Sequence, residues 1–295
     1  MAYIEEHHEP PPRPKKQGPP TLVKFYLLAY NILSALGWFY ILLITVTHLF
    51  NLDGAHNAAS VSPSPFAQLL ARIPLARPAR TAVGKLEEYL PAAFTPVLRR
   101  AATTYARVGW QTTIVQSFAV LEVLHVLLGW VRSPLGTTLA QVASRLYLVW
   151  GITYLFDNTR THPLYASMVL SWAITEVVRY SFYAFALLGR EPRFLLLLRY
   201  TLFYVLYPTG AGSEAGLIYA SLPSPGPAAS LLSHLPVRFQ ALFEKPWYQA
   251  LHDDVRGVLF CIWWPGLYVM YTHMMKQRRR VLGKGRTLGA KPKSI

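Results

Sequence analysis

Two side chains that can exchange protons lie in one apolar stretch, residues 195–222. The phenol of Tyr207 can donate a proton and the carboxylate of Glu214 can accept one, so the pair suits general acid–base chemistry. Between them stand Pro208 and Gly210, which a lipid-facing helix does not need. On a regular helix seven residues span about 10 Å. We therefore expect this Pro-Gly break to kink or unwind the segment and to aim both side chains at one small centre.

Further polar side chains lie inside the apolar runs, where ionisable groups are costly and usually functional. Helical spacing places Glu176 beside Arg179, and Glu122 beside His125. Their depth in the runs predicts one interior cluster, although ion pairs that only hold helices in register would have the same spacing. This supporting polar set comprises Glu122, His125, Arg145, Glu176, Arg179, Tyr180 and Arg199.

Composition indicates that membrane-spanning helices position these groups. The 295 residues are 53% apolar and 15% charged, against roughly 25% charged in soluble domains. The net charge of +15 lies mostly between and outside the apolar runs, so no basic domain for nucleic acid remains. The single cysteine, Cys261, excludes an intramolecular disulfide, a thiolate zinc site and an iron–sulfur cluster.

The apolar runs predict an all-α, polytopic membrane protein with a six-transmembrane-helix bundle at 21–275. The N-terminal tail, 1–20, should be disordered and cytosolic, and 276–295 should be a basic cytosolic tail. Residues 51–110 should form a long lumenal loop insertion that could carry interfacial helices. The six helices are expected at about 21–50, 111–131, 135–156, 163–189, 194–221 and 257–275.

The distribution of basic residues predicts the topology. The last twenty residues hold eight Lys or Arg and no acid, which places that end in the cytosol by the positive-inside rule. Arg132, Arg190 and Arg193 lie in the short connections that would share that side. The 51–110 loop carries seven basic and three acidic residues, which fits this topology least well. The first apolar run should remain in the protein as a signal anchor.

Four ordered motifs carry a resemblance to a known family. They are YLLAYNILSALGW, LEVLHVLLGWVRSPLGTTLAQVASRLYLVW, SWAITEVVRYSFYAF and LLRYTLFYVLYPTGAGSE, within about 26–276. The chain resembles the very-long-chain (3R)-3-hydroxyacyl-CoA dehydratases of fatty-acid elongation, once called protein-tyrosine-phosphatase-like proteins. The chain departs from the family's pattern in its long 51–110 region and in 222–254, neither of which touches a motif.

The resemblance implies a lyase that removes water from a (3R)-3-hydroxyacyl-CoA to give the trans-2-enoyl-CoA, the third step of elongation. It implies Tyr207 and Glu214 as catalytic residues, without a metal or organic cofactor. Glu214 would be the base and Tyr207 the acid, with the reverse assignment open. One arginine, Arg199, Arg179 or Arg145, would polarise the thioester carbonyl or hold Glu214 ionised.

The implied partners are the long-chain 3-hydroxyacyl-CoA substrate, the lipid bilayer and other fatty-acid elongation enzymes, with no nucleic acid. The acyl chain would lie in an apolar channel between the helices. The CoA phosphates would lie near Arg132, Arg190 and Arg193, although these arginines are also ordinary positive-inside residues.

Three other function classes were compared with this hypothesis. A thiol phosphatase needs the motif H-C-x5-R, whose cysteine is the nucleophile. This chain has the histidine at His125 and the arginine at Arg132, but the cysteine position is Val126, so phosphatase chemistry lacks its nucleophile. A transporter or channel would also use a polar cluster and a broken helix, but no inverted repeat is visible. A non-catalytic scaffold of the elongation complex would not need Tyr207 or Glu214.

The last residues suggest a location. Lys291 and Lys293 stand at the fifth and third positions from the end, which resembles the K-x-K-x-x signal for retrieval to the endoplasmic reticulum. A basic tail can also place two lysines there by chance. We expect a multi-pass protein of the endoplasmic reticulum membrane with cytosolic N- and C-termini.

Overall fold

The computed structural model describes residues 20–54, 83, 87, 89–222 and 247–283, and every regular element within these ranges is helical. This confirms the all-α fold class. In chain order the elements are α1 (Thr21–Phe50), η2 (Ala92–Phe94), α4 (Thr95–Ala101), α5 (Thr104–Ser117), α6 (Val120–Leu127), α7 (Leu135–Leu146), η3 (Tyr147–Thr153), α8 (Asp157–Arg160), α9 (Leu164–Leu187), α10 (Arg193–Arg199), α11 (Phe203–Ser221) and α14 (Trp247–Gly283).

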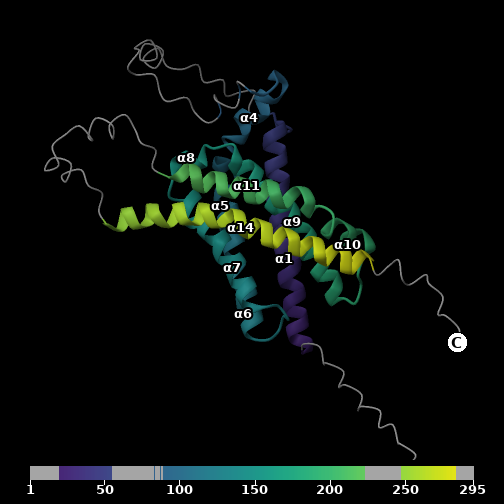
Figure 1. Ribbon diagram of the computed structural model, residues 1–295. Coiled ribbons are helices and arrows are strands. Elements are labelled where there is room, and N and C mark those ends of the chain that lie inside the picture. The colour runs from purple at the N-terminus through teal and green to yellow at the C-terminus, as the bar shows by residue number, and fades with distance from the viewer. Residues whose placement is uncertain (1–19, 55–82, 84–86, 88, 223–246, 284–295) are drawn as a thin grey trace, which may run out of the picture.

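Helices α1 and α9 form the centre of the molecule and pack against each other, while α11 packs on α9 and contacts α14. Figure 1 shows α11 and α14 running side by side across α1, with α6 and α7 beside the first half of α1. Segments far apart in the chain therefore meet around α9.

The main core cluster contains buried apolar side chains from α1, α5, η3, α9 and α11. Trp38 of α1 and Trp172 of α9 are each 2% exposed and meet edge to face, with ring centroids 6.3 Å apart. Two buried polar groups of α1 are satisfied within their own helix: the Asn31 amide donates to the Leu27 carbonyl, and the Thr45 hydroxyl to the Ile41 carbonyl, each at 2.7 Å. Such bonds remove the cost of burying a polar group.

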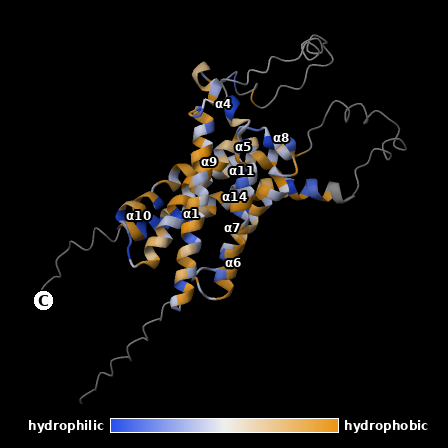
Figure 2. Ribbon diagram, turned by 180° about the vertical axis from the view of Figure 1, so that it is seen from behind, coloured by the Kyte–Doolittle hydropathy of each residue, from blue (hydrophilic) through white to orange (hydrophobic). Residues whose placement is uncertain are grey.

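Helix α1 also presents a wide apolar face outward, which Figure 2 shows as orange along its length. Its exposed residues include Leu22, Phe25, Ile32, Leu33, Leu36, Phe39 and Leu43. Among the described helices, α1 alone is long and apolar enough to cross a membrane unbroken, while α10 and α11 qualify together as a pair bent by 42°. The six-span arrangement therefore remains a prediction.

Several boundaries differ from the sequence-based expectation. Within 51–110, residues 92–101 are helical and α5 already begins at Thr104. Pro91 and Pro96 do not prevent this, because Pro96 lies at the start of α4, where its missing amide would have no helical partner. Helix α14 covers 247–283 rather than about 257–275, so part of the expected basic tail continues the helix.

The expected break at Pro208 is wrong. Helix α11 continues through Pro208 and Gly210, and the bend lies before it, at Tyr200–Leu202. Pro208 lies in the second turn of α11, so the carbonyl that loses its amide partner belongs to Tyr204, in the first turn. The chain leaves helical geometry at Tyr200, where φ is −95° and ψ is 10°.

One turn type is unusual. Helix α7 passes directly into η3, a seven-residue π-helix whose backbone bonds each enclose one residue more than those of an α-helix. Arg145 lies two residues before this segment, and Leu148 and Ile152 within the segment are buried in the core.

Candidate active site

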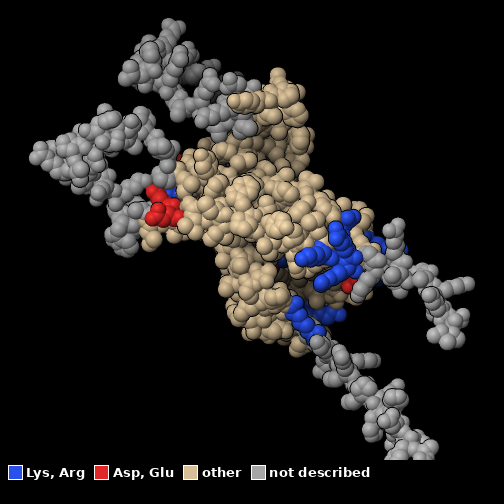
Figure 3. All heavy atoms as spheres, in the orientation of Figure 1, with Lys and Arg blue, Asp and Glu red and all other residues tan. Residues whose placement is uncertain are grey.

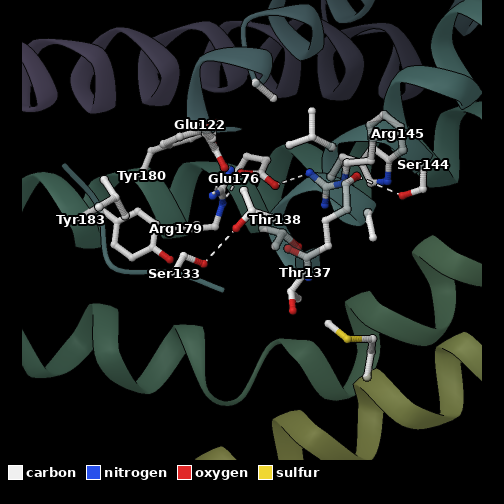
Figure 4. A pocket seen from close by; sticks show the side chains of 18 of the residues that line it. Glu122, Ser133, Thr137, Thr138, Ser144, Arg145, Glu176, Arg179, Tyr180 and Tyr183 are labelled. Carbon is white, nitrogen blue, oxygen red and sulfur yellow. Dashed lines mark hydrogen bonds and ion pairs between the residues drawn. The ribbon is translucent and has the colours of Figure 1, made fainter. Parts of the chain in front are cut away.

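A cavity of about 1650 Å³ lies between α1, α6, α7, α9, α10, α11 and α14. Figure 4 shows its charged wall, with side chains from α6, α7 and α9 pointing toward one another. Both Tyr207 and Glu214 line it, as does Arg132. All seven members of the supporting polar set line it as well. The structure thus brings ten predicted site residues to one space.

A continuous chain of charges forms part of this wall. Arg179 donates from both terminal nitrogens to Glu122, at 2.7 and 3.0 Å, and from Nε to Glu176 Oε2 at 2.6 Å. Arg145 donates from Nη1 to the other oxygen of Glu176. The Tyr180 hydroxyl donates to Glu122. The Glu176 side chain is 3% exposed, so this pairing compensates a buried charge.

The helical spacings predicted only part of this pattern. Glu176 and Arg179 meet as expected, but Glu122 pairs with Arg179 rather than with His125. The His125 ring instead bonds the Tyr26 hydroxyl at 3.1 Å and stacks on Trp130. His125 therefore belongs to an aromatic part of the cavity wall.

Glu214 is held by two tryptophans that the sequence analysis did not single out. Trp172 of α9 donates its indole N–H to Oε1 at 2.6 Å, and Trp263 of α14 donates to Oε2 at 2.9 Å. An ionised carboxylate only accepts hydrogen bonds, so two N–H donors suit that form. A signal was present, because each tryptophan lies in an apolar run and a buried indole N–H needs an acceptor.

Tyr207 and Glu214 lie two turns apart on one continuous helix, about 10 Å along its axis. Tyr207 is half-buried in the cavity wall, and Arg145 and Glu214 are charged groups that act on its phenol. The Arg145 guanidinium lies 4.9 Å from the ring centre of Trp172. Tyr207, Arg145, Trp172 and Glu214 therefore form one region of the cavity wall.

The remaining predicted arginines lie apart from the chain of charges. Arg199 donates to the Tyr183 hydroxyl at 3.1 Å and lies over the rings of Phe182 and Tyr183. Arg132 is exposed at the edge of the cavity, whereas Arg190 and Arg193 are exposed and do not line it. Lys291 and Lys293 lie outside the described residues.

The arrangement can move protons. Along the described segments, no three His, Cys, Asp or Glu side chains are grouped as metal ligands would be. A phenol and a carboxylate face a space large enough for an extended ligand, and the cationic Arg145, a member of the chain of charges, acts on that carboxylate. These are the components of acid–base catalysis with electrostatic stabilisation.

Comparison with known proteins gives consistent matches. The family model described as "Protein tyrosine phosphatase-like protein, PTPLA" matches residues 116–284. Over 205 residues the chain is 40% identical to the very-long-chain (3R)-3-hydroxyacyl-CoA dehydratase PASTICCINO 2 of Arabidopsis thaliana, covering 66% of this chain and 90% of the relative.

Two further relatives come from other kingdoms. A probable very-long-chain (3R)-3-hydroxyacyl-CoA dehydratase of Schizosaccharomyces pombe is 45% identical over 168 residues, 57% of this chain and 71% of the relative. The very-long-chain (3R)-3-hydroxyacyl-CoA dehydratase hpo-8 of Caenorhabditis elegans is 34% identical over 264 residues, 89% of this chain and 97% of the relative. No solved structure matches the chain.

Proposed function

Because this chain belongs to the protein tyrosine phosphatase-like family, PTPLA, we propose that it dehydrates a very-long-chain (3R)-3-hydroxyacyl-CoA to the trans-2-enoyl-CoA. The structural observation that carries the proposal is the pair formed by Tyr207 and Glu214 on one wall of the large cavity. The relatives named above supply the reaction and the substrate class.

The proposed reaction is an elimination of water. Glu214 takes a proton from C2, which the neighbouring thioester acidifies, and the C–H electrons form the double bond between C2 and C3. The C3–O bond breaks as its oxygen takes the proton of Tyr207, and water leaves. Transfer of the proton from Glu214 to the tyrosinate through water restores both groups. The reverse assignment of acid and base uses the same two residues.

Among the three candidate arginines, the contacts favour Arg145 for the electrostatic role. Arg179 is engaged by both Glu122 and Glu176, and Arg199 lies against aromatic rings. Arg145 bonds one carboxylate oxygen and lies on the side of the cavity that holds Glu214 and Tyr207. Its positive charge can stabilise the enolate-like charge that develops on the thioester oxygen.

The cavity also suits the two unlike ends of the substrate. Apolar residues such as Leu206, Leu267 and Met270 line one part, where an acyl chain would lie. Arg132 at the edge is the best placed of the three arginines for a CoA phosphate, because it alone lines the cavity.

We place the protein in the endoplasmic reticulum membrane with six crossings, both termini in the cytosol and other elongation enzymes as partners. The outward apolar face of α1 supports membrane insertion. Figure 3 shows Lys and Arg gathered near α10, the end of α14 and the start of α1, while most of the remaining visible surface is uncharged. Clustered cations at one end agree with the positive-inside rule.

The function is tested with purified protein in detergent and a long-chain 3-hydroxyacyl-CoA, with the enoyl-CoA product measured by mass spectrometry. The (3R) substrate should lose water, and the (3S) substrate should not. No product from the native protein would overturn the dehydratase proposal. Transport of an acyl-CoA across vesicles without dehydration would favour the transporter class.

A further inference from the structure

The carboxylate of Glu214 is fixed by hydrogen bonds that come from two other helices. Trp172 on α9 and Trp263 on α14 each donate an indole N–H, one to each oxygen. Because the two bonds engage different oxygens, they fix both the position and the rotation of the carboxylate plane. Each oxygen keeps lone-pair capacity for a substrate proton.

Trp172 is itself held on two sides. Its ring meets Trp38 of α1 edge to face, at a centroid distance of 6.3 Å, and the Arg145 guanidinium of α7 lies 4.9 Å from its centre. Arg145 is in turn bonded to Glu176, one helical turn after Trp172. Trp172 therefore contacts both Arg145, a member of the chain of charges, and the carboxylate of Glu214.

We infer that Trp172 and Trp263 are positioning residues that hold Glu214 as an ionised, correctly oriented base, and this rests on the proposed dehydratase function. A protonated carboxyl would gain less from two N–H donors than the carboxylate does, so the donors favour the proton-accepting state before substrate binds. The inference also assigns the roles: Glu214 removes the C2 proton, and Tyr207 protonates the leaving hydroxyl.

Other charged and titratable groups also act on Glu214. Arg145 on α7, which is paired with Glu176 on α9, interacts with Glu214 through its charge, and Tyr207 lies on the same helix. Trp263 is the neutral contact from α14. Replacing an indole with a phenyl ring leaves these three charged or titratable groups in the chain and removes the N–H donor, although Trp172→Phe also shortens the ring against which Arg145 and Trp38 pack.

The test compares Trp172→Phe and Trp263→Phe with the native protein. Each variant should lower kcat by about 10- to 100-fold, the value of one hydrogen bond to a charged group, with little change in KM. The acidic limb of the kcat profile should move to higher pH, since the carboxylate has lost a stabilising donor. Trp263→His, which can still donate an N–H, should recover part of the rate.

Two controls separate a positioning role from general loss of packing. Trp264→Phe changes the adjacent residue, whose ring is half exposed and does not line the cavity. Trp150→Phe removes another indole bond, the 3.0 Å bond to Ser117, away from Glu214. Both should keep native kcat and the native pH limb.

A readout without turnover completes the test. The carboxylate stretching band of Glu214 is assigned by its loss in Glu214→Gln and should shift in both tryptophan variants. An unshifted band together with native kcat and pH limb in those variants overturns the inference. If the native protein dehydrates nothing, the proposed function falls instead, and the band shift then tests the carboxylate contacts alone.

Discussion

At the level of single residues, the proposed chemistry depends on proton transfer by Tyr207 and Glu214. Tyr207→Phe and Glu214→Gln keep the shape of each side chain and remove its acid–base function. Each should lower kcat by about 100- to 10 000-fold, the usual contribution of a general acid or base. Product formation by purified protein, with helical content checked by circular dichroism, measures this.

Matched changes outside the cavity serve as controls for these two variants. Tyr219 lies at an exposed position of the same helix, and Glu191 is exposed before α10. The controls are Tyr219→Phe and Glu191→Gln. Both should retain native kcat. A catalytic variant that keeps more than about a tenth of the rate, a barrier change below about 1.4 kcal/mol, would place the acid–base pair elsewhere.

Arg179 should matter for stability as well as for activity. Arg179→Ala would leave Glu122 and Glu176 without their shared cation, and breaking buried pairs in this way costs about 3 to 5 kcal/mol. The thermal midpoint in detergent should fall clearly, whereas Arg190→Ala at an exposed site should leave it unchanged. Equal midpoints for the two variants would show that the charge chain contributes little to the fold.

The sequence could predict contacts within one helix but not the partners between helices. Glu176 and Arg179 are three residues apart, so helical geometry alone brings them together. The bonds from Arg145 to Glu176 and from Trp263 to Glu214 join residues 31 and 49 positions apart. Their formation depends on how α7, α9 and α14 pack, which spacing within a segment does not determine.

At the level of elements, Pro208 should be dispensable. Because α11 is continuous and bends before Phe203, Pro208→Ala would restore one backbone bond and leave the course of the helix unchanged. In the same dehydration assay, we expect the kcat of this variant to lie within about twofold of the native value. Such a difference corresponds to only about 0.4 kcal/mol in the activation free energy. A loss of a hundredfold would show that the proline shapes the site.

A nearby glycine supplies the contrast. A Cβ at Gly210 would lie 3.3 Å from Ser171 Cβ, so Gly210→Leu should disturb the packing of α11 on α9 and lower activity. A Cβ at Gly212 would meet nothing within 4 Å, and Gly212→Leu should be tolerated.

The element boundaries show the same limit of sequence reasoning. Apolar runs indicated the helical segments that became α1 and α9, because length and composition are local properties. The bend at Tyr200–Leu202 carries no glycine or proline, so no turn residue marked it. Pro208 was a false signal, since a proline near a helix start removes a single bond.

At the level of the whole molecule, topology and location can be read with one reporter. A glycosylation acceptor introduced near Ser62 should be modified if 51–110 is lumenal, and the glycan should stay sensitive to endoglycosidase H. Adding Lys291→Ser with Lys293→Ser should let part of the protein reach later compartments, where the glycan becomes resistant. Dehydration in isolated membranes should not change.

The same acceptor placed at Ala290 is the control, since a cytosolic tail is not glycosylated. An unmodified acceptor near Ser62 would contradict the six-span topology. A glycan that stays fully sensitive in the double lysine variant would show that residence depends on other features than the two lysines.

The π-helical segment η3 sets the angular phase between Arg145 and the buried half of its helix. An α-helix turns by about 100° per residue. A π-helix turns less per residue, because each of its bonds encloses one residue more. Deleting one residue between Tyr147 and Thr153 would let this segment return to α-helical bonding, and the loss of the extra residue would be offset by the larger turn of each residue that remains. Arg145 should then still face Glu176. The charge chain should therefore survive the loss of a residue within η3, whereas a deletion in a regular α-helix turns the flanking side chains by about 100°.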